Sequence, residues 1–113
     1  MATRYYLSLP DPKLARGEPG IGFSAFGAAE FAAQLQDALR TTNLFDRWRN
    51  AQDDPDGVDA SMGATDPAAT VVGSQSDLRV DLVATTSLPG NILKHRLRVL
   101  AGNGWELRDV TGA

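Results

Sequence analysis

Few side chains in this sequence are of the types that carry out chemistry. The 113 residues contain no cysteine and a single histidine, His95. Thiolates and imidazoles are the usual ligands of zinc, and thiolates hold iron–sulfur clusters. His95 is the one side chain with an ordinary pKa near neutrality, but no serine or carboxylate can be placed beside it from the sequence. We therefore predict no catalytic residues, no metal site and no cofactor.

A glycine-rich stretch, GEPGIG at residues 17–22, follows a predicted strand and precedes a predicted helix. At that position, the backbone N–H groups of glycine-rich loops bind phosphate in nucleotide-binding proteins. The stretch lacks the lysine of the Walker pattern and the spacing of the dinucleotide fingerprint. With Lys13 and Arg16 just before it, it is a candidate anion site, and an ordinary flexible loop is the alternative.

A second basic cluster, KHRLR at residues 94–98, lies on a predicted helix. Lys94 and Arg98 are one turn apart and share a side of that helix. Together with His95 they form a second candidate anion site, and a solvated helix face is the simpler interpretation. The cluster could also contact the acidic segment of the same chain, an attraction that salt would weaken.

The acidic residues are unevenly distributed. Five of the 14 lie between residues 53 and 66, which leaves nine for the 11 basic residues elsewhere in a chain of net charge −3. The acidic segment does not have the ligand register of an EF-hand loop, so we predict no calcium site. The rest of the chain is only mildly basic, which makes nucleic acid an unlikely partner.

The hydrophobic pattern predicts which elements hold these side chains. Apolar residues alternate through Leu78, Val80 and Leu82, as in a strand with one buried face, and recur at helical spacing from Ile92 to Leu100. The same reasoning predicts strands at 4–9, 70–72, 78–86 and 105–110, and helices from about 25 or 27 to 40, at 44–51, and from 87 or 88 to about 101. The turn before Leu78 is predicted at residues 73–77.

The order of these elements favours an α+β fold. We predict a single domain, 1–113, that is a two-layer, ferredoxin-like βαββαβ sandwich with an antiparallel sheet of order 4-1-3-2 and two main helices on one face. Long loops are expected at 10–24 and 52–69, with a frayed C-terminus at 111–113. Two points stay open: whether 44–51 is a helix or a strand, and whether 53–69 is disordered or an ordered lid.

The face of the sheet without helices is the third candidate surface. Strand alternation places Tyr6, Arg79, Asp81 and Arg108 on it, together with Ser8, Val72, Val83, Thr85, Glu106 and Val110. One interpretation is a solvated face with the charged side chains paired across strands. The other two interpretations are a face-to-face homodimer and a platform for single-stranded nucleic acid. Such a platform usually has two or three aromatic side chains, and this face has one, Tyr6.

The sequence therefore favours a small soluble protein-interaction or assembly module without catalytic activity, whose partner is another protein or a second copy. The N-terminus has no secretory signal pattern and no apolar run is long enough to span a membrane, so we expect a cytoplasmic protein. One alternative is a small-ligand binder or enzyme. The predicted topology is similar to that of acylphosphatases, which bind phosphate in the loop that corresponds to the one with Arg16 here. It is also similar to that of dimeric α+β barrel enzymes, which pair two such sheets around a pocket where His95 or Tyr6 would act. A single-stranded nucleic-acid binder is the second alternative.

Overall fold

The computed structural model describes residues 2–113 as a four-stranded antiparallel sheet covered by helices. The α+β class predicted from the sequence is therefore confirmed. The strands are β1 (Thr3–Leu9), β2 (Thr70–Ser76), β3 (Arg79–Thr86) and β4 (Glu106–Gly112), and the helices are α1 (Ala28–Arg40), α2 (Asn43–Asn50) and α3 (Gly90–Ala101). Short 3-10 turns lie at Pro12–Leu14, Pro55–Gly57 and Ala60–Gly63.

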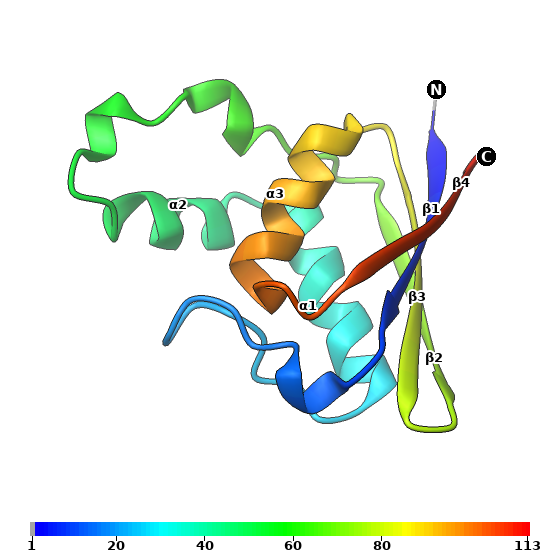
Figure 1. Cartoon of the computed structure of the whole chain (residues 1–113). Helices are drawn as coiled ribbons and strands as arrows, with labels where there is room; N and C mark the ends of the chain where they lie inside the picture. Colours follow the sequence, from blue (N-terminus) through cyan, green and yellow to red (C-terminus); the bar gives the residue numbers. More distant parts are fainter. Residues whose placement is uncertain (1) are drawn as a thin grey trace.

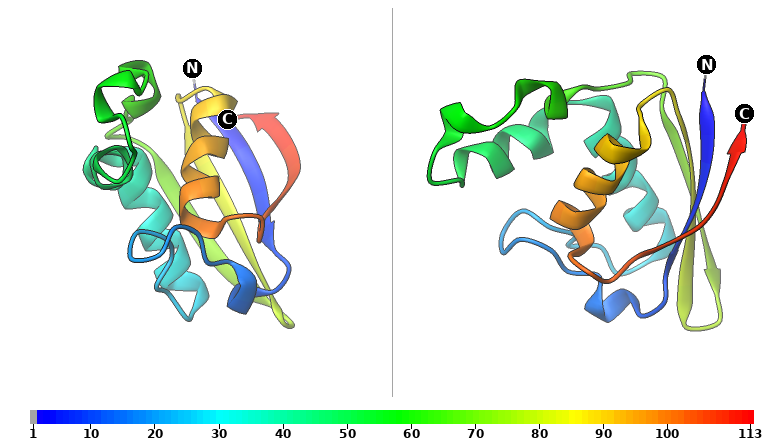
Figure 2. Two further views of the ribbon diagram at one scale, coloured as in Figure 1. Left: turned by 60° about the vertical axis from the view of Figure 1, so that its left-hand side comes forward. Right: turned by 45° about the horizontal axis from the view of Figure 1, so that its top comes forward.

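The strands lie side by side in the order β2-β3-β1-β4, which from the other edge reads β4-β1-β3-β2. Each neighbouring pair is antiparallel. Helices α1 and α3 lie on the same side of the sheet, and α2 lies beyond them, away from the strands (Figure 1). The two turned views show the same arrangement (Figure 2). One face of the sheet is thus covered, and the opposite one, which we call the open face, is not.

The core lies between the covered face and the two long helices. Leu7, Leu82 and Phe31 are at most 2% exposed and come from β1, β3 and α1 respectively. Helix α3 contributes the stripe predicted from its apolar spacing, including Leu93 and Leu97. Residues 43–50 form a helix and not the strand that was the alternative for this segment, and they bury Leu44 and Phe45.

The β2–β3 hairpin differs from its prediction. Strand β2 continues to Ser76, and the turn consists of Asp77 and Leu78 alone. Asp77 has a φ of 60°, which aspartate tolerates better than most residues and which tight hairpin turns require. Leu78, expected at the start of a strand, is consequently 82% exposed at the tip of the hairpin.

Strand β4 contains a bulge that the sequence did not reveal. Tyr6 pairs with Asp109 and Leu7 pairs with Leu107, so Arg108 is an extra residue opposite β1. An extra residue reverses the alternation of side chains beyond it. The predicted place of Val110 on the open face is therefore wrong, because Val110 pairs with Tyr5. The residues expected to fray extend the same strand, with Thr111 opposite Arg4 and Gly112 opposite Thr3.

Candidate functional site

The glycine-rich loop at residues 17–22 is packed against the C-terminal end of α3. The N–H groups of Gly17 and Glu18 donate to the carbonyl oxygens of Leu100 and Val99, at 3.0 and 3.1 Å. A Cβ on Gly17 would lie 1.9 Å from the Val99 carbonyl oxygen, so only glycine allows this approach. The N–H groups of Ile21 and Gly22 donate to Glu18 within the loop. The loop therefore uses these donors for its own packing and does not present them to an anion.

Arg16 closes this loop from the other side. Its guanidinium group donates to the carbonyl oxygens of Phe23, at 3.3 Å, and Ala25, at 2.7 Å, and makes a longer contact of 3.5 Å with its neighbour Ala15. The guanidinium carbon is also 5.6 Å from the ring centres of both Phe26 and Phe31. The positive charge of Arg16 is thus placed between two aromatic rings.

Arg16 and Lys13 line a hollow of about 670 Å³ at the end of the sandwich where β1 ends. We call this hollow the end groove; its walls come from residues 10–16, residues 25–31 and the β2–β3 hairpin tip, with Pro10, Pro12, Phe26 and Leu78 among them. Phe26 is 85% exposed and Leu78 is 82% exposed, although both are large and apolar. This groove could not be predicted from the sequence, because the hairpin tip that forms one wall is more than 40 residues from the other two walls in the chain.

The second predicted anion site is not assembled as expected. Lys94 and Arg98 are exposed on α3, but the His95 ring packs edge-on against Trp48, with ring centres 4.4 Å apart. Burial lowers the pKa of His95, and the charges of Arg96 and Arg98 lower it further. His95 is therefore neutral at pH 7 and joins α3 to α2 rather than adding charge to the cluster.

Arg96 has a role that the sequence reading missed. The residue is 0% exposed and donates to the carbonyl oxygens of Ala38, Met62 and Ala64 at 3.3, 2.6 and 2.9 Å. Its guanidinium carbon lies 5.2 Å from the centre of the Phe45 ring, and burial lowers its pKa. A signal was present, because position 96 lies at helical spacing between buried Leu93 and Leu100.

Arg96 thus holds residues 52–69 at Met62 and Ala64, and Asp66 holds them at a second point. One carboxylate oxygen accepts hydrogen bonds from the Thr86 hydroxyl and the Ser87 N–H, both at 2.9 Å, and these bonds hold its pKa below the ordinary value. The backbone N–H of Asp66 donates to the Leu39 carbonyl oxygen at 2.8 Å. Residues 52–69, which we call the strap, are thus held by hydrogen bonds to the C-terminal end of α1 and to the residues before α3. Helix α3 begins at Gly90 rather than at 87 or 88, because Pro89 has an extended ψ of 154° and is the N-cap residue.

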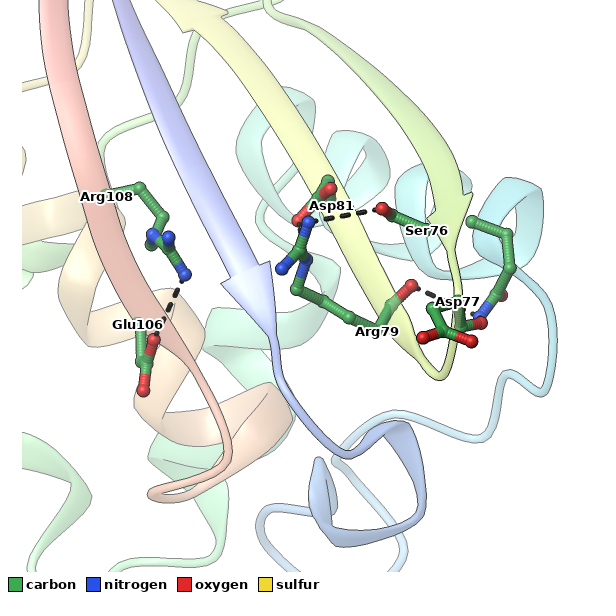
Figure 3. A network of polar contacts seen from close by, with 7 residues as sticks. Ser76, Asp77, Arg79, Asp81, Glu106 and Arg108 are labelled. Carbon is green, nitrogen blue, oxygen red and sulfur yellow. Dashed lines mark hydrogen bonds and ion pairs between the residues drawn. The ribbon is translucent and has the colours of Figure 1, made fainter.

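The open face brings together the four side chains predicted for it. Tyr6, Arg79, Asp81 and Arg108 line one hollow of about 240 Å³. The ion pairs run along strands and not across them, which corrects the predicted pairing: Arg79 Nε is 3.0 Å from Asp81 Oδ1, and Arg108 Nη1 is 3.6 Å from Glu106 Oε2 (Figure 3). Hydrogen bonds from Arg4 and Thr111 lower the pKa of the exposed Tyr6 hydroxyl.

Two further observations concern metal sites and membrane spans in the described part of the chain. Among residues 2–113, no three acidic, histidine or cysteine side chains are grouped so as to hold a metal ion. Within the same range, none of the helices has the length and apolar content needed to cross a bilayer. No protein-family model, curated protein or solved structure matches this chain.

Proposed function

We propose that this protein is a small, non-catalytic interaction module that binds a segment of a partner protein in the end groove. The observation that carries the proposal is the exposure of Phe26, 85%, and Leu78, 82%, on the walls of one hollow. Two large apolar side chains on the walls of one hollow present apolar surface that binding would remove from water. Aromatic and aliphatic anchors of this kind contribute most of the binding free energy at protein interfaces.

The charges around the groove define the partner further. Lys13 and Arg16 contribute two positive charges, and Asp11 is the acidic residue of the lining. The Asp11 carboxylate accepts a hydrogen bond from the Lys13 backbone N–H, at 3.1 Å, where it caps the first 3-10 turn. The groove therefore favours a segment with an apolar anchor next to an acidic side chain, because a cation beside apolar walls attracts a carboxylate strongly.

We propose that the part of the chain outside the end groove is a scaffold that holds the groove in place. We propose that the domain is ferredoxin-like, with α2 and the strap as additions between the first helix and the second strand. The order of elements and the antiparallel pairing on both sides of β1 support this assignment. We also propose a cytoplasmic location, favoured by a composition without cysteine.

A peptide selection tests the interaction directly. Random peptides displayed on phage are selected on the full chain, and the enriched peptides are measured on a Phe26→Ser/Leu78→Ser variant. We expect enriched peptides to combine an apolar anchor with an acidic residue, and the double variant to bind them at least about tenfold more weakly. Val72→Ser is the matched control, because Val72 is 66% exposed on β2 outside the groove lining. Failure to enrich any peptide, or equal binding to the double variant, would contradict the proposal.

A small anionic molecule is the second candidate occupant. The placement of the Arg16 guanidinium between the Phe26 and Phe31 rings favours it, because apolar walls with one fixed cation are typical of small-molecule sites. The dye 8-anilinonaphthalene-1-sulfonate, which is both apolar and anionic, is a suitable probe. Saturable fluorescence that Phe26→Ser abolishes, without any peptide enrichment, would favour this candidate over a protein segment.

A further inference from the structure

An unpaired hydroxyl group lies under the open face of the sheet. Ser8 is 0% exposed, and among the described residues its Oγ has no hydrogen-bond partner. A buried hydroxyl without a partner costs free energy, so native structures rarely leave one. Ser8 alternates with Leu7 and Leu9 of the core, which places it on the side of the open face, where it lines a hollow of about 290 Å³.

One arginine lies on each side of the strand that carries this hydroxyl. Arg79 lies on β3 and Arg108 on β4, with β1 between them (Figure 3). Both side chains line the 290 Å³ hollow that contains Ser8 and the 240 Å³ hollow that contains Tyr6. Strands two apart in a sheet are separated by about 10 Å, a distance that two arginine side chains can close from opposite sides. The two guanidinium groups are therefore able to meet above β1.

Several donors of these arginines are not used by their carboxylate neighbours. Arg79 Nε lies 3.0 Å from Asp81 Oδ1 in an ion pair but makes no hydrogen bond among the described residues, and Nη2 donates to the Ser76 hydroxyl at 3.1 Å. Arg108 makes only the 3.6 Å contact with Glu106, which is longer than a hydrogen bond. Nη1 of Arg79, and Nε and Nη2 of Arg108, have no partner among the contacts of the described residues. Asp81 and Glu106 orient the two guanidinium groups and leave these donors for another acceptor.

We propose that Arg79, Arg108 and Ser8 form a binding site for a tetrahedral oxyanion, a phosphate or sulfate group. Such an anion presents oxygens in three directions, toward a guanidinium on each side and a hydroxyl beneath. Paired arginines bind phosphate oxygens with directional, charge-assisted hydrogen bonds. The anion supplies the acceptor that Ser8 Oγ lacks. It also places a negative charge beside Arg108, whose contact with Glu106 is long. The hollow that contains Ser8 adjoins the end groove, with which it shares Pro10 and Leu78, but the anion site uses neither residue and its proposal does not depend on the interaction function.

Titration with inorganic phosphate, followed by amide NMR shifts at constant ionic strength, tests the site. We expect saturable shifts at Ser8, Arg79 and Arg108, and at least about a tenfold loss of affinity in an Arg79→Met/Arg108→Met variant. Arg98→Met, which removes an exposed arginine on α3, is the matched control and should leave the affinity unchanged. Phenyl phosphate tests whether the natural ligand is a phosphate ester or the free anion. A site for esters would bind phenyl phosphate more tightly than inorganic phosphate, because its ring would lie beside Tyr6. A site for the free anion would bind the two equally.

Ser8→Ala separates a ligand donor from a packing defect. If the hydroxyl binds the anion, the variant loses several-fold in phosphate affinity and its phosphate-free fold is as stable as before or more so. Unchanged affinity in Ser8→Ala would overturn the proposal, as would shifts that do not saturate, that chloride reproduces, or that Arg98→Met reduces as much as the double variant does.

Discussion

Two long loops of this protein are held in the same way, yet in different surroundings. Residues 10–24 are closed by Arg16 and residues 52–69 by Arg96, and each guanidinium group contacts three backbone carbonyl oxygens and an aromatic ring. Neither arginine has a carboxylate within ion-pair distance among the described residues. Arg16 is exposed, whereas Arg96 is 0% exposed.

This difference separates a side chain that shapes a surface from one that holds the fold. Water competes for the hydrogen bonds of an exposed arginine, so those of Arg16 contribute less to stability than those of a fully buried side chain. The Arg96 side chain is fully buried, with one buried hydrogen bond to Ala38 and part-buried ones to Met62 and Ala64, so its loss costs more. The strap therefore depends on Arg96, and loop 10–24 depends mainly on its own backbone hydrogen bonds to α3.

The largest expected effect distinguishes the two arginines. Arg96→Met should lower the free energy of unfolding by about 3 kcal/mol, because a fully buried guanidinium loses three hydrogen bonds and its place beside Phe45, and Arg16→Met by about 1 kcal/mol or less. Urea unfolding measures both, and amide hydrogen exchange should speed up at residues 60–66 only in the Arg96 variant. Arg98→Met controls for the loss of a positive charge on α3. Equal losses for Arg16 and Arg96 would remove the distinction between the two loops.

A glycine substitution tests the backbone attachment of loop 10–24. Gly17→Ala should cost about 2 kcal/mol of unfolding free energy, because its Cβ would lie 1.9 Å from the Val99 carbonyl oxygen and the loop would have to move. Gly112→Ala is the control, since a Cβ at Gly112 has nothing within 4 Å. Thermal unfolding of both variants measures the difference. A Gly17 variant as stable as the Gly112 variant would mean that Arg16 alone is sufficient to hold the loop.

The smallest effect concerns Asp66 and depends on pH. Hydrogen bonds from Ser87 and Thr86 lower the pKa of Asp66 in the folded protein, so its carboxylate stabilises the fold above the unfolded pKa, and this contribution is lost as pH falls through the folded pKa. Asp66→Asn should therefore cost about 1 kcal/mol at pH 7 and almost nothing at the acid end of a titration. Chemical denaturation at several pH values measures this. Because the pKa of Asp59 is also lowered, the wild type and variant must be compared at each pH.

Much of the scaffold follows from local patterns. The apolar spacing in α1 and α3 and the alternation in β1 and β3 predicted these elements, because one buried face imposes its period on the sequence. The same alternation placed Tyr6, Arg79, Asp81 and Arg108 on one face, where the structure has them together. It could not locate the bulge at Arg108, since a bulge depends on pairing with β1 and not on the residues of β4 alone.

The surfaces on which function depends were decided by tertiary structure. The end groove exists because the hairpin tip meets residues 10–16 and 25–31 at one end of the sandwich, and the strap is held by Arg96, Leu39 and Thr86, which lie on other elements. The amino-acid sequence by itself determined the periods of the helices and strands, which report burial of neighbouring residues. It did not determine which distant carbonyl groups each arginine reaches, because such contacts leave no periodic pattern in the residues that make them.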